Sequence, residues 1–160
     1  MRYRCVLLYD GTDFHGWQLQ PDRRTVQGEV ERAIARMTGE TVRVAAAGRT
    51  DAGVHAAGQV IAFDLVRDWP AAVLFRGLNA VLPADLAIRE LSQAAADFDP
   101  RRSASSREYV YRIWNARWRS PFWNRRAWQV ARPLDVAAMN AAAACLLGEH
   151  DFSSFRAATC

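Results

Sequence analysis

Lysine is absent from this chain of 160 residues, and cysteine and histidine are scarce, with three residues of each. The cationic side chains other than histidine are therefore all arginines. Cys5, Cys145 and Cys160 lie far apart, in neither a zinc-ligand spacing nor a disulfide framework, and the histidines are equally scattered. We interpret the cysteines as small buried hydrophobic residues and expect no metal site.

Long apolar runs are also missing. No hydrophobic stretch approaches the roughly 20 residues that a membrane-spanning helix needs. The apolar stretch that begins at Cys5 is too short and too quickly interrupted for a signal peptide. We therefore expect a protein without a membrane partner that works in the cytoplasm.

The arginines are unevenly distributed along the chain. Residues 101–132 contain nine arginines against one acidic residue, Glu108, a net charge of +8, whereas the whole chain carries only +4. Seven aromatic rings are interleaved with these arginines. Guanidinium groups pair with phosphates and flat rings stack on unpaired bases, so the pattern predicts an RNA-contacting surface. A solvated edge whose rings turn into the core is the alternative. The arginines predicted to contact RNA are Arg101, Arg102, Arg117, Arg119, Arg125 and Arg126.

The hydrophobic periodicity predicts an α+β fold. In the first part of the chain, helices are expected at 26–38, capped by Thr25, and at 70–79. Strands are expected there at 2–9, 42–47, 57–65 and 86–91. Further on, the pattern indicates strands at 106–115 and 126–130 and a helix at 135–147. These lengths favour ferredoxin-like, split βαβ domains in which helices cover one face of a mainly antiparallel sheet.

The connection between the strands expected at 42–47 and 57–65 is the most unusual segment. It reads Gly48-Arg49-Thr50-Asp51-Ala52-Gly53-Val54-His55. Its two glycines permit a positive φ and a tight turn that presents Arg49 and Asp51. A neighbouring arginine can keep a carboxylate ionised, and an ionised, oriented aspartate can act as nucleophile, base or metal ligand. An aspartate in such a turn can equally have only the structural role of an Asx-turn.

This loop, extended to Ala56, resembles the signature segment of the TruA-type tRNA pseudouridine synthases. Other segments agree with that family in order and spacing, and the resemblance covers essentially the whole chain. They are Tyr9-Asp10-Gly11-Thr12 with Gly16-Trp17-Gln18, Thr25-Val26-Gln27-Gly28, Arg107-Glu108-Tyr109-Val110-Tyr111-Arg112, and the segment from Leu146 to Arg156.

The resemblance implies that uridine is converted to pseudouridine in the anticodon stem-loop of tRNA. Asp51 would be the catalytic aspartate, Tyr109 would lie beside the target uracil, and Arg49 would contact RNA or help to displace the target base. Without the resemblance, Tyr109 reads as a core residue of an alternating strand. The reaction is an isomerisation that needs no energy input, so no cofactor is expected. Members of the family act as homodimers with a basic cleft between two similar α/β domains.

The resemblance also sets the expected domain organisation. Residues 1–97 are expected to form a domain that carries the Asp51 loop, 98–105 a crossing segment, and 106–160 part of a second domain. Family members continue past the segment that matches Ser154-Phe155-Arg156, and that continuation supplies another basic active-site residue. We therefore expect this chain alone to be inactive, with exposed apolar side chains at 130–160 and an open cleft at Asp51.

Two other functions have to be weighed against this one. A non-catalytic RNA-binding module on a ferredoxin-like fold would use the arginine-rich surface but leaves the 48–55 loop without a role. A carboxylate-dependent hydrolase of glycosidic bonds would need a second acid facing Asp51, for which Asp10 and Asp13 are the candidates. The agreement of several motifs favours the synthase.

Overall fold

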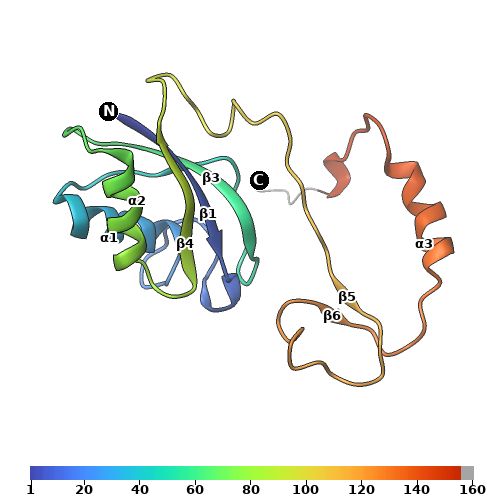
Figure 1. Ribbon diagram of the computed structural model, residues 1–160. Helices are drawn as coiled ribbons and strands as arrows, with labels where there is room; N and C mark the ends of the chain where they lie inside the picture. Colours follow the sequence, from blue (N-terminus) through green and yellow to red (C-terminus); the bar gives the residue numbers. More distant parts are fainter. Residues whose placement is uncertain (156–160) are drawn as a thin grey trace. The chain divides into compact units, whose positions relative to one another are not determined.

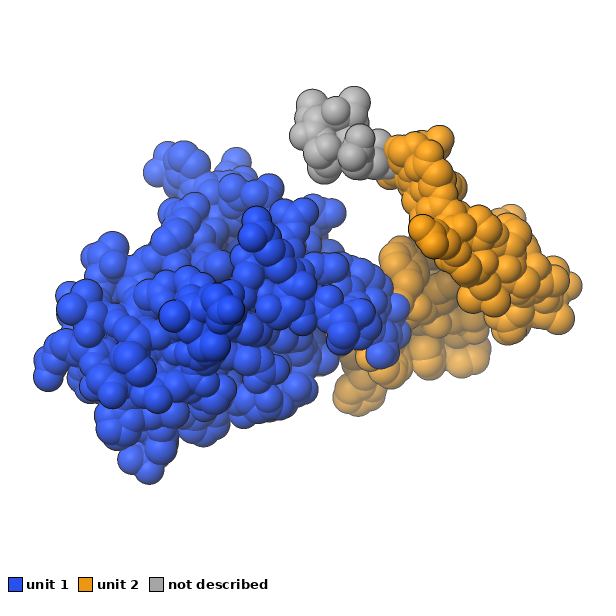
Figure 2. All heavy atoms as spheres, turned by 90° about the horizontal axis from the view of Figure 1, so that it is seen from above, with its two compact units in different colours: residues 1–110 blue, residues 111–160 orange. Residues whose placement is uncertain are grey.

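The computed structural model describes residues 1–155 (Figure 1). The chain divides into two compact units, coloured separately in Figure 2: unit 1 covers Met1–Val110, and unit 2 begins at Tyr111. The expected domain boundaries at residues 97 and 105 stay predictions. Among the described residues, no helix is long and apolar enough to cross a bilayer.

Unit 1 is built on a four-stranded antiparallel sheet with the order β2-β3-β1-β4. Its strands are β1 (Arg2–Tyr9), β2 (Ala45–Ala46), β3 (Ala56–Asp64) and β4 (Leu86–Gln93). β1 is central, and its Val6 lies opposite Val60 on one side and Glu90 on the other. The predicted α+β class with a mainly antiparallel sheet is confirmed, whereas the ferredoxin-like detail stays a prediction.

Two helices, α1 (Val26–Thr38) and α2 (Ala71–Val81), cover one face of this sheet (Figure 1). As expected, α1 is capped by Thr25, whose hydroxyl accepts a hydrogen bond from the Gly28 amide, and it ends at Gly39 in a left-handed conformation. The core between helices and sheet contains side chains that are fully or almost fully buried, including Tyr3, Leu7, Ile34, Ile61 and Leu74.

The strand expected at 42–47 is mostly absent, because only Ala45 and Ala46 pair with β3. Side chains of α1 hold the backbone of the preceding residue instead. Glu31 accepts a hydrogen bond from the Val44 amide at 3.0 Å, and the Gln27 amide group donates to the Val44 carbonyl at 3.3 Å. Val44 is buried as its place in the pattern predicts, but its polar groups are satisfied without a strand partner.

Unit 2 contains little regular structure. It comprises β5 (Ile113–Trp114), β6 (Trp128–Gln129), α3 (Val136–Ala143) and the short 3-10 helices Ala144–Leu146 and Ser153–Phe155. The strand expected at 106–115 is wrong for residues 106–112, which form no strand in the described part of the chain. Of these residues, Arg112 still contacts β6, because its carbonyl accepts from the Trp128 amide at 2.8 Å. The alternating pattern has no partner there to form a ladder. The strand expected at 126–130 is found over two residues.

Helix α3 starts after Asp135, whose carboxylate caps it by accepting from the Ala138 amide, as expected. It ends four residues before Leu147 and continues as a 3-10 turn, so the helix expected at 135–147 is too long. No residue of α3 is buried, and Leu147 is 77% exposed. The exposed apolar side chains expected beyond residue 130 are therefore present. The burial expected for the cysteines holds for Cys5 and is wrong for Cys145, and Cys160 lies outside the described residues.

An arginine clamp joins the segment before α1 to the segment before β4. Arg24 donates two hydrogen bonds to the carboxylate of Asp85, at 2.7 and 2.9 Å, and a third to Glu29 at 3.0 Å. Its guanidinium also lies 4.2 Å from the centre of the Phe14 ring. The paired hydrogen bonds from Arg24 hold the pKa of Asp85 below its ordinary value.

We predict that this clamp contributes stability that acid removes. Because the pKa of Asp85 is lower in the folded chain, the unfolded chain binds the proton first as the pH falls. The contribution is complete above the unfolded pKa, about 4, and is lost as the pH falls through the folded pKa. Asp85→Asn should therefore flatten the decline of the unfolding free energy below about pH 4, measured by chemical denaturation. The exposed Asp22→Asn is the matched control, and equal slopes in the wild type and Asp85→Asn would contradict the prediction.

Candidate active site

The Asp51 loop, residues 48–55, joins β2 to β3 and is anchored at both ends. The Ala47 amide donates to the Val60 carbonyl at 2.9 Å, and the side-chain amide of Gln59 donates to the Gly48 carbonyl. At the other end, the Asp51 carbonyl accepts from the Val54 amide at 3.2 Å and closes a turn. Of the two glycines that permit a positive φ, Gly53 has one (79°) and Gly48 does not.

The end of β1 and the loop that follows it form a second layer behind the Asp51 loop. The Trp17 amide donates to the Thr50 carbonyl at 2.9 Å, and the hydroxyl of Tyr9 lies 2.9 Å from the hydroxyl of Thr50. The Gly53 amide donates to the Phe14 carbonyl at 3.3 Å. Burial raises the pKa of Tyr9, and the hydrogen bond to Thr50 offsets part of this increase. Asp51 thus follows a residue held at both its carbonyl and its side chain.

Two glycines allow the backbones of these layers to approach. A Cβ on Gly11 would lie 1.9 Å from the Val54 carbonyl oxygen, and one on Gly16 would lie 2.7 Å from the Thr50 carbonyl oxygen. Gly16 also has a φ of +83°, which disfavours any side chain. Motif segments about 40 residues apart in the sequence are therefore in direct contact.

A histidine at the end of the loop connects to the same layer. Nδ1 of His55 lies 3.0 Å from a carboxylate oxygen of Asp10 and 3.1 Å from the Gly11 amide. When Nδ1 carries no hydrogen it accepts from the Gly11 amide, and when it carries one it donates to Asp10, so the two contacts exclude each other. Asp10 also accepts from the Thr12 amide. Asp10, one of the two acids considered as a partner for Asp51 in the hydrolase hypothesis, is thus held by neighbours of its own.

Asp51 itself is exposed, as is Arg49. Within residues 1–155, no hydrogen bond or ion pair joins the two side chains, so the orienting role considered for the arginine is not present in this structure. The turn of the backbone, rather than a neighbouring cation, fixes the position of Asp51.

The segment that carries Tyr109 reaches the start of this loop within unit 1. Arg107 donates to the Ala47 carbonyl at 3.0 Å. The Tyr109 hydroxyl lies 4.0 Å from the position that a Cβ would take on Gly48. Tyr109 is 76% exposed, so the alternative that it is a core residue is wrong. The ring lies at the Asp51 loop with its surface accessible.

Sequence reasoning missed the supporting roles of Tyr9 and Arg107. Both stand in motif segments, but only their contacts with Thr50 and Ala47 reveal what they do. A tyrosine at the buried end of a strand, directly before a glycine-rich loop, is the signal that could have indicated the first of these roles.

The six arginines predicted to contact RNA are all exposed. Arg101 and Arg102 lie in unit 1, where their amides donate to the carboxylate of Asp99. The other four lie in unit 2, in the segment between β5 and β6. Across the described residues, no three His, Cys, Asp or Glu side chains are grouped as a metal site would require.

Comparison with known proteins shows the family to which this sequence belongs. The profile of the tRNA pseudouridine synthase family matches residues 6–101, which include the second half of β1, α1 and the Asp51 loop. The chain belongs to this family. The resemblance seen in the motifs is thereby confirmed.

Individual relatives extend the match to almost the whole chain. Over 159 residues the chain is 50% identical to tRNA pseudouridine synthase A of Myxococcus xanthus, covering 99% of the chain and 60% of that protein. It is 51% identical over 162 residues to the protein of the same name from Sinorhizobium medicae, covering 99% and 66%. For the Geobacter sulfurreducens protein the identity is 48% over 157 residues, covering 98% and 64%. The chain thus spans less than two thirds of the length of these curated relatives.

We predict that Gly16→Ala costs about 1 kcal/mol or more of unfolding free energy beyond Gly39→Ala. The two glycines have nearly equal φ values, 83° and 78°, so the strain of a side chain in that conformation is common to both. Only at Gly16 does the new Cβ meet the Asp51 loop, whereas Gly39 has nothing within 4 Å. Chemical denaturation of the two variants measures the difference. Equal destabilisation of the two variants would show that the contact with Thr50 is unimportant.

Proposed function

We propose that this chain provides the catalytic aspartate of an isomerase that converts uridine to pseudouridine in the anticodon stem-loop of tRNA. The observation that carries the proposal is the exposed Asp51 in a backbone turn held by Thr50 and Gly53, within a chain of the tRNA pseudouridine synthase family. Relatives named tRNA pseudouridine synthase A support the substrate class.

The reaction breaks the N1–C1′ bond of uridine and forms a C5–C1′ bond, while C5 loses a proton and N1 gains one. Atoms and electrons balance within the nucleotide, so the proposal invokes no cofactor. Asp51 is the nucleophile in this scheme. Its carboxylate can attack C1′, add to C6 or remove a proton from the sugar, and each route needs an ionised oxygen within reach of the substrate.

Tyr109 and Arg49 are assigned supporting roles at the target nucleotide. The uridine must leave its stack, which costs a few kcal/mol. The exposed ring of Tyr109, next to the start of the Asp51 loop, offers a surface for the displaced uracil. Arg49 is exposed and not engaged with Asp51, so its guanidinium is available for RNA. It would contact the backbone or occupy the space that the displaced base leaves.

The six arginines predicted to contact RNA, from Arg101 to Arg126, are assigned to the phosphates of the same tRNA. All six are exposed, and the stretch from Arg101 to Arg132 carries a net charge of +8. Such a concentration of charge attracts a polyanion and releases its counterions.

We also propose a fold type for unit 1, and an assembly and location for the full protein. The element order of unit 1 and its sheet order β2-β3-β1-β4 support a ferredoxin-like, split βαβ domain. We also propose that the full protein is a cytoplasmic homodimer. Its activity is proposed to need sequence beyond the part of the relatives that this chain covers, so the 160 residues alone should be inactive.

Replacing Asp51 by Asn should abolish turnover while leaving the fold and the affinity for tRNA unchanged. The exchange is nearly isosteric, and an exposed side chain has no packing to lose. Pseudouridine is mapped in unmodified tRNA after incubation with the protein completed by the segment that its relatives have beyond the matched region. Asp22→Asn, an exposed aspartate of the same unit, is the control and should retain full activity. More than a few per cent of wild-type activity in Asp51→Asn would contradict the assignment of Asp51 as the nucleophile. Inactivity of the completed wild-type protein would favour the non-catalytic RNA-binding module.

Replacing an arginine that binds a phosphate by alanine should weaken tRNA binding. The slope of log K against log salt should fall by about 0.7 to 0.9 for every arginine–phosphate pair that the substitution removes. Binding of the wild type and of a variant with all six arginines replaced is measured across a range of salt concentrations. Arg36→Ala, an exposed arginine on α1, controls for the removal of charge alone. An unchanged slope in the sixfold variant would show that RNA does not follow this surface.

A further inference from the structure

Unit 2 contains a cavity of about 490 Å³ between β5, β6 and the segment that connects them. This volume lies within the range of about 300–1,000 Å³ that is usual for small-ligand sites. Six side chains define its chemistry. They are Trp114, Trp123, Arg119, Ser120, Asn124 and Gln129.

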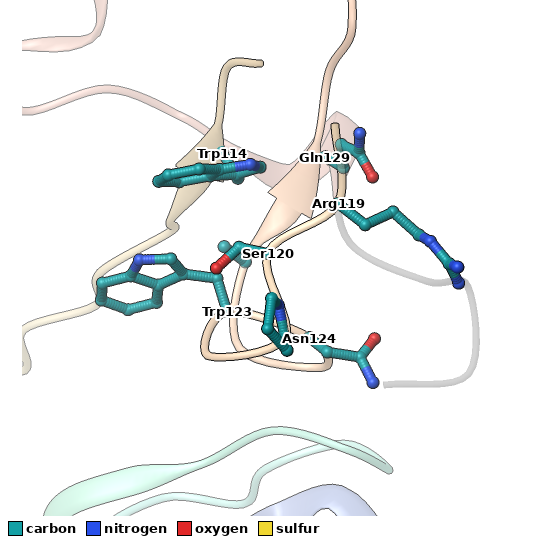
Figure 3. Close-up of a pocket in the computed structure, with 8 residues that line it drawn as sticks. Trp114, Arg119, Ser120, Trp123, Asn124 and Gln129 are labelled. Carbon is teal, nitrogen blue, oxygen red and sulfur yellow. The ribbon is translucent and has the colours of Figure 1, made fainter. Parts of the chain in front are cut away.

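The walls of the cavity differ in character. In Figure 3 the rings of Trp114 and Trp123 lie toward one side, and Arg119, Asn124 and Gln129 lie toward the other. The cavity therefore combines flat apolar surfaces with a cation and two amide groups. A planar ligand with hydrogen-bonding edges and an attached negative charge matches all three features.

Hydrogen bonds hold much of this framework in place. The indole nitrogen of Trp114 donates to the Trp118 carbonyl at 2.9 Å, and the Gln129 amide donates to the Ala116 carbonyl at 3.2 Å. Amides of Arg126 and Ala127 donate to the Trp123 carbonyl at 3.0 Å. The two walls are thus formed by the fold of the segment itself, and 40% of the Trp123 residue remains exposed.

Charge points to the kind of occupant. Residues 111–132 of unit 2 contain six arginines and no acidic residue. A protein segment that filled the cavity would need acidic groups to compensate these arginines, whereas RNA brings a phosphate with every base. Stacking rings beside arginines are also the usual means by which proteins hold unpaired bases.

We propose that this cavity binds an unpaired nucleobase of tRNA, stacked on Trp123, with its phosphate at Arg119. The residues of this cavity belong to unit 2 and those of the Asp51 loop to unit 1. In the proposal the cavity holds a second nucleotide, not the one that is isomerised. The proposal rests on the proposed RNA substrate, but it does not depend on the catalytic role of Asp51.

The test compares two ligands of equal charge. The 160-residue chain is titrated with a fluorescently labelled six-nucleotide single-stranded RNA and with an abasic strand of the same length. The wild type should bind the RNA more tightly than it binds the abasic strand. Trp123→Leu, which keeps bulk but removes the ring, should reduce the affinity for the RNA roughly 5- to 100-fold and change it little for the abasic strand. Trp123→Phe should retain most of the affinity because a ring is still present.

Matched controls localise the effect. Trp118→Leu removes an exposed tryptophan that does not line the cavity and should leave binding unchanged. Arg119→Ala should weaken the binding of both strands and reduce the slope of log K against log salt, whereas Trp123→Leu should not alter that slope. The proposal would be overturned if the wild type bound the two strands equally or bound neither. It would also be overturned if Trp118→Leu weakened RNA binding as much as Trp123→Leu does. Asp51→Asn should bind the RNA like the wild type, so failure of the cavity and failure of the catalytic assignment are distinguishable.

Discussion

The contact between two backbone segments, the one after β1 and the Asp51 loop, determines most of what unit 1 can do. It is possible only because Gly11 and Gly16 lack a Cβ, since a side chain there would meet the Val54 or Thr50 carbonyl. The same segment is also joined to the start of α1, because the Val26 amide donates a hydrogen bond to the Gly16 carbonyl at 3.2 Å. The central strand, the first helix and the loop that presents Asp51 are therefore held in one arrangement, and a displacement of any of them would move the carboxylate.

A site built on backbone contacts has a consequence for its electrostatics. Asp51 has no ion pair within the described residues and is exposed to water, which solvates its charge. In the proposed function this solvation ends when RNA covers the loop, because closing a site removes water and strengthens the interactions that remain. The rigid turn then matters more than the resting charge environment, since a fixed carboxylate needs little rearrangement when the substrate arrives.

Elements with local signals could be predicted from the sequence, and elements that depend on partners could not. Thr25 and Gly39 mark the ends of α1, and the alternating face of β1 contains the residues that are buried. The strands expected at 42–47 and 106–115 were each found over only two residues, because pairing depends on what lies opposite. Side chains of α1 bind the backbone groups of Val44, and the segment before Arg112 has no partner strand in the described part of the chain. The role of Asp51 was predicted from family resemblance, whereas the contact of Tyr9 with the neighbouring Thr50 required coordinates.

The two units use aromatic residues in opposite ways, and this difference bears on how the proposed protein would select RNA. Unit 1 buries its rings, as in the stacked pair Tyr3 and Phe63, whose centres are 5.6 Å apart. Unit 2 leaves the ring of Trp123 partly exposed among arginines. Arginines attract any polyanion, so charge alone does not distinguish a duplex from a loop. Exposed rings add an interaction that only unstacked bases can satisfy. In this scheme, charge brings RNA to the protein, rings select its unpaired regions, and the braced aspartate acts on one nucleotide there.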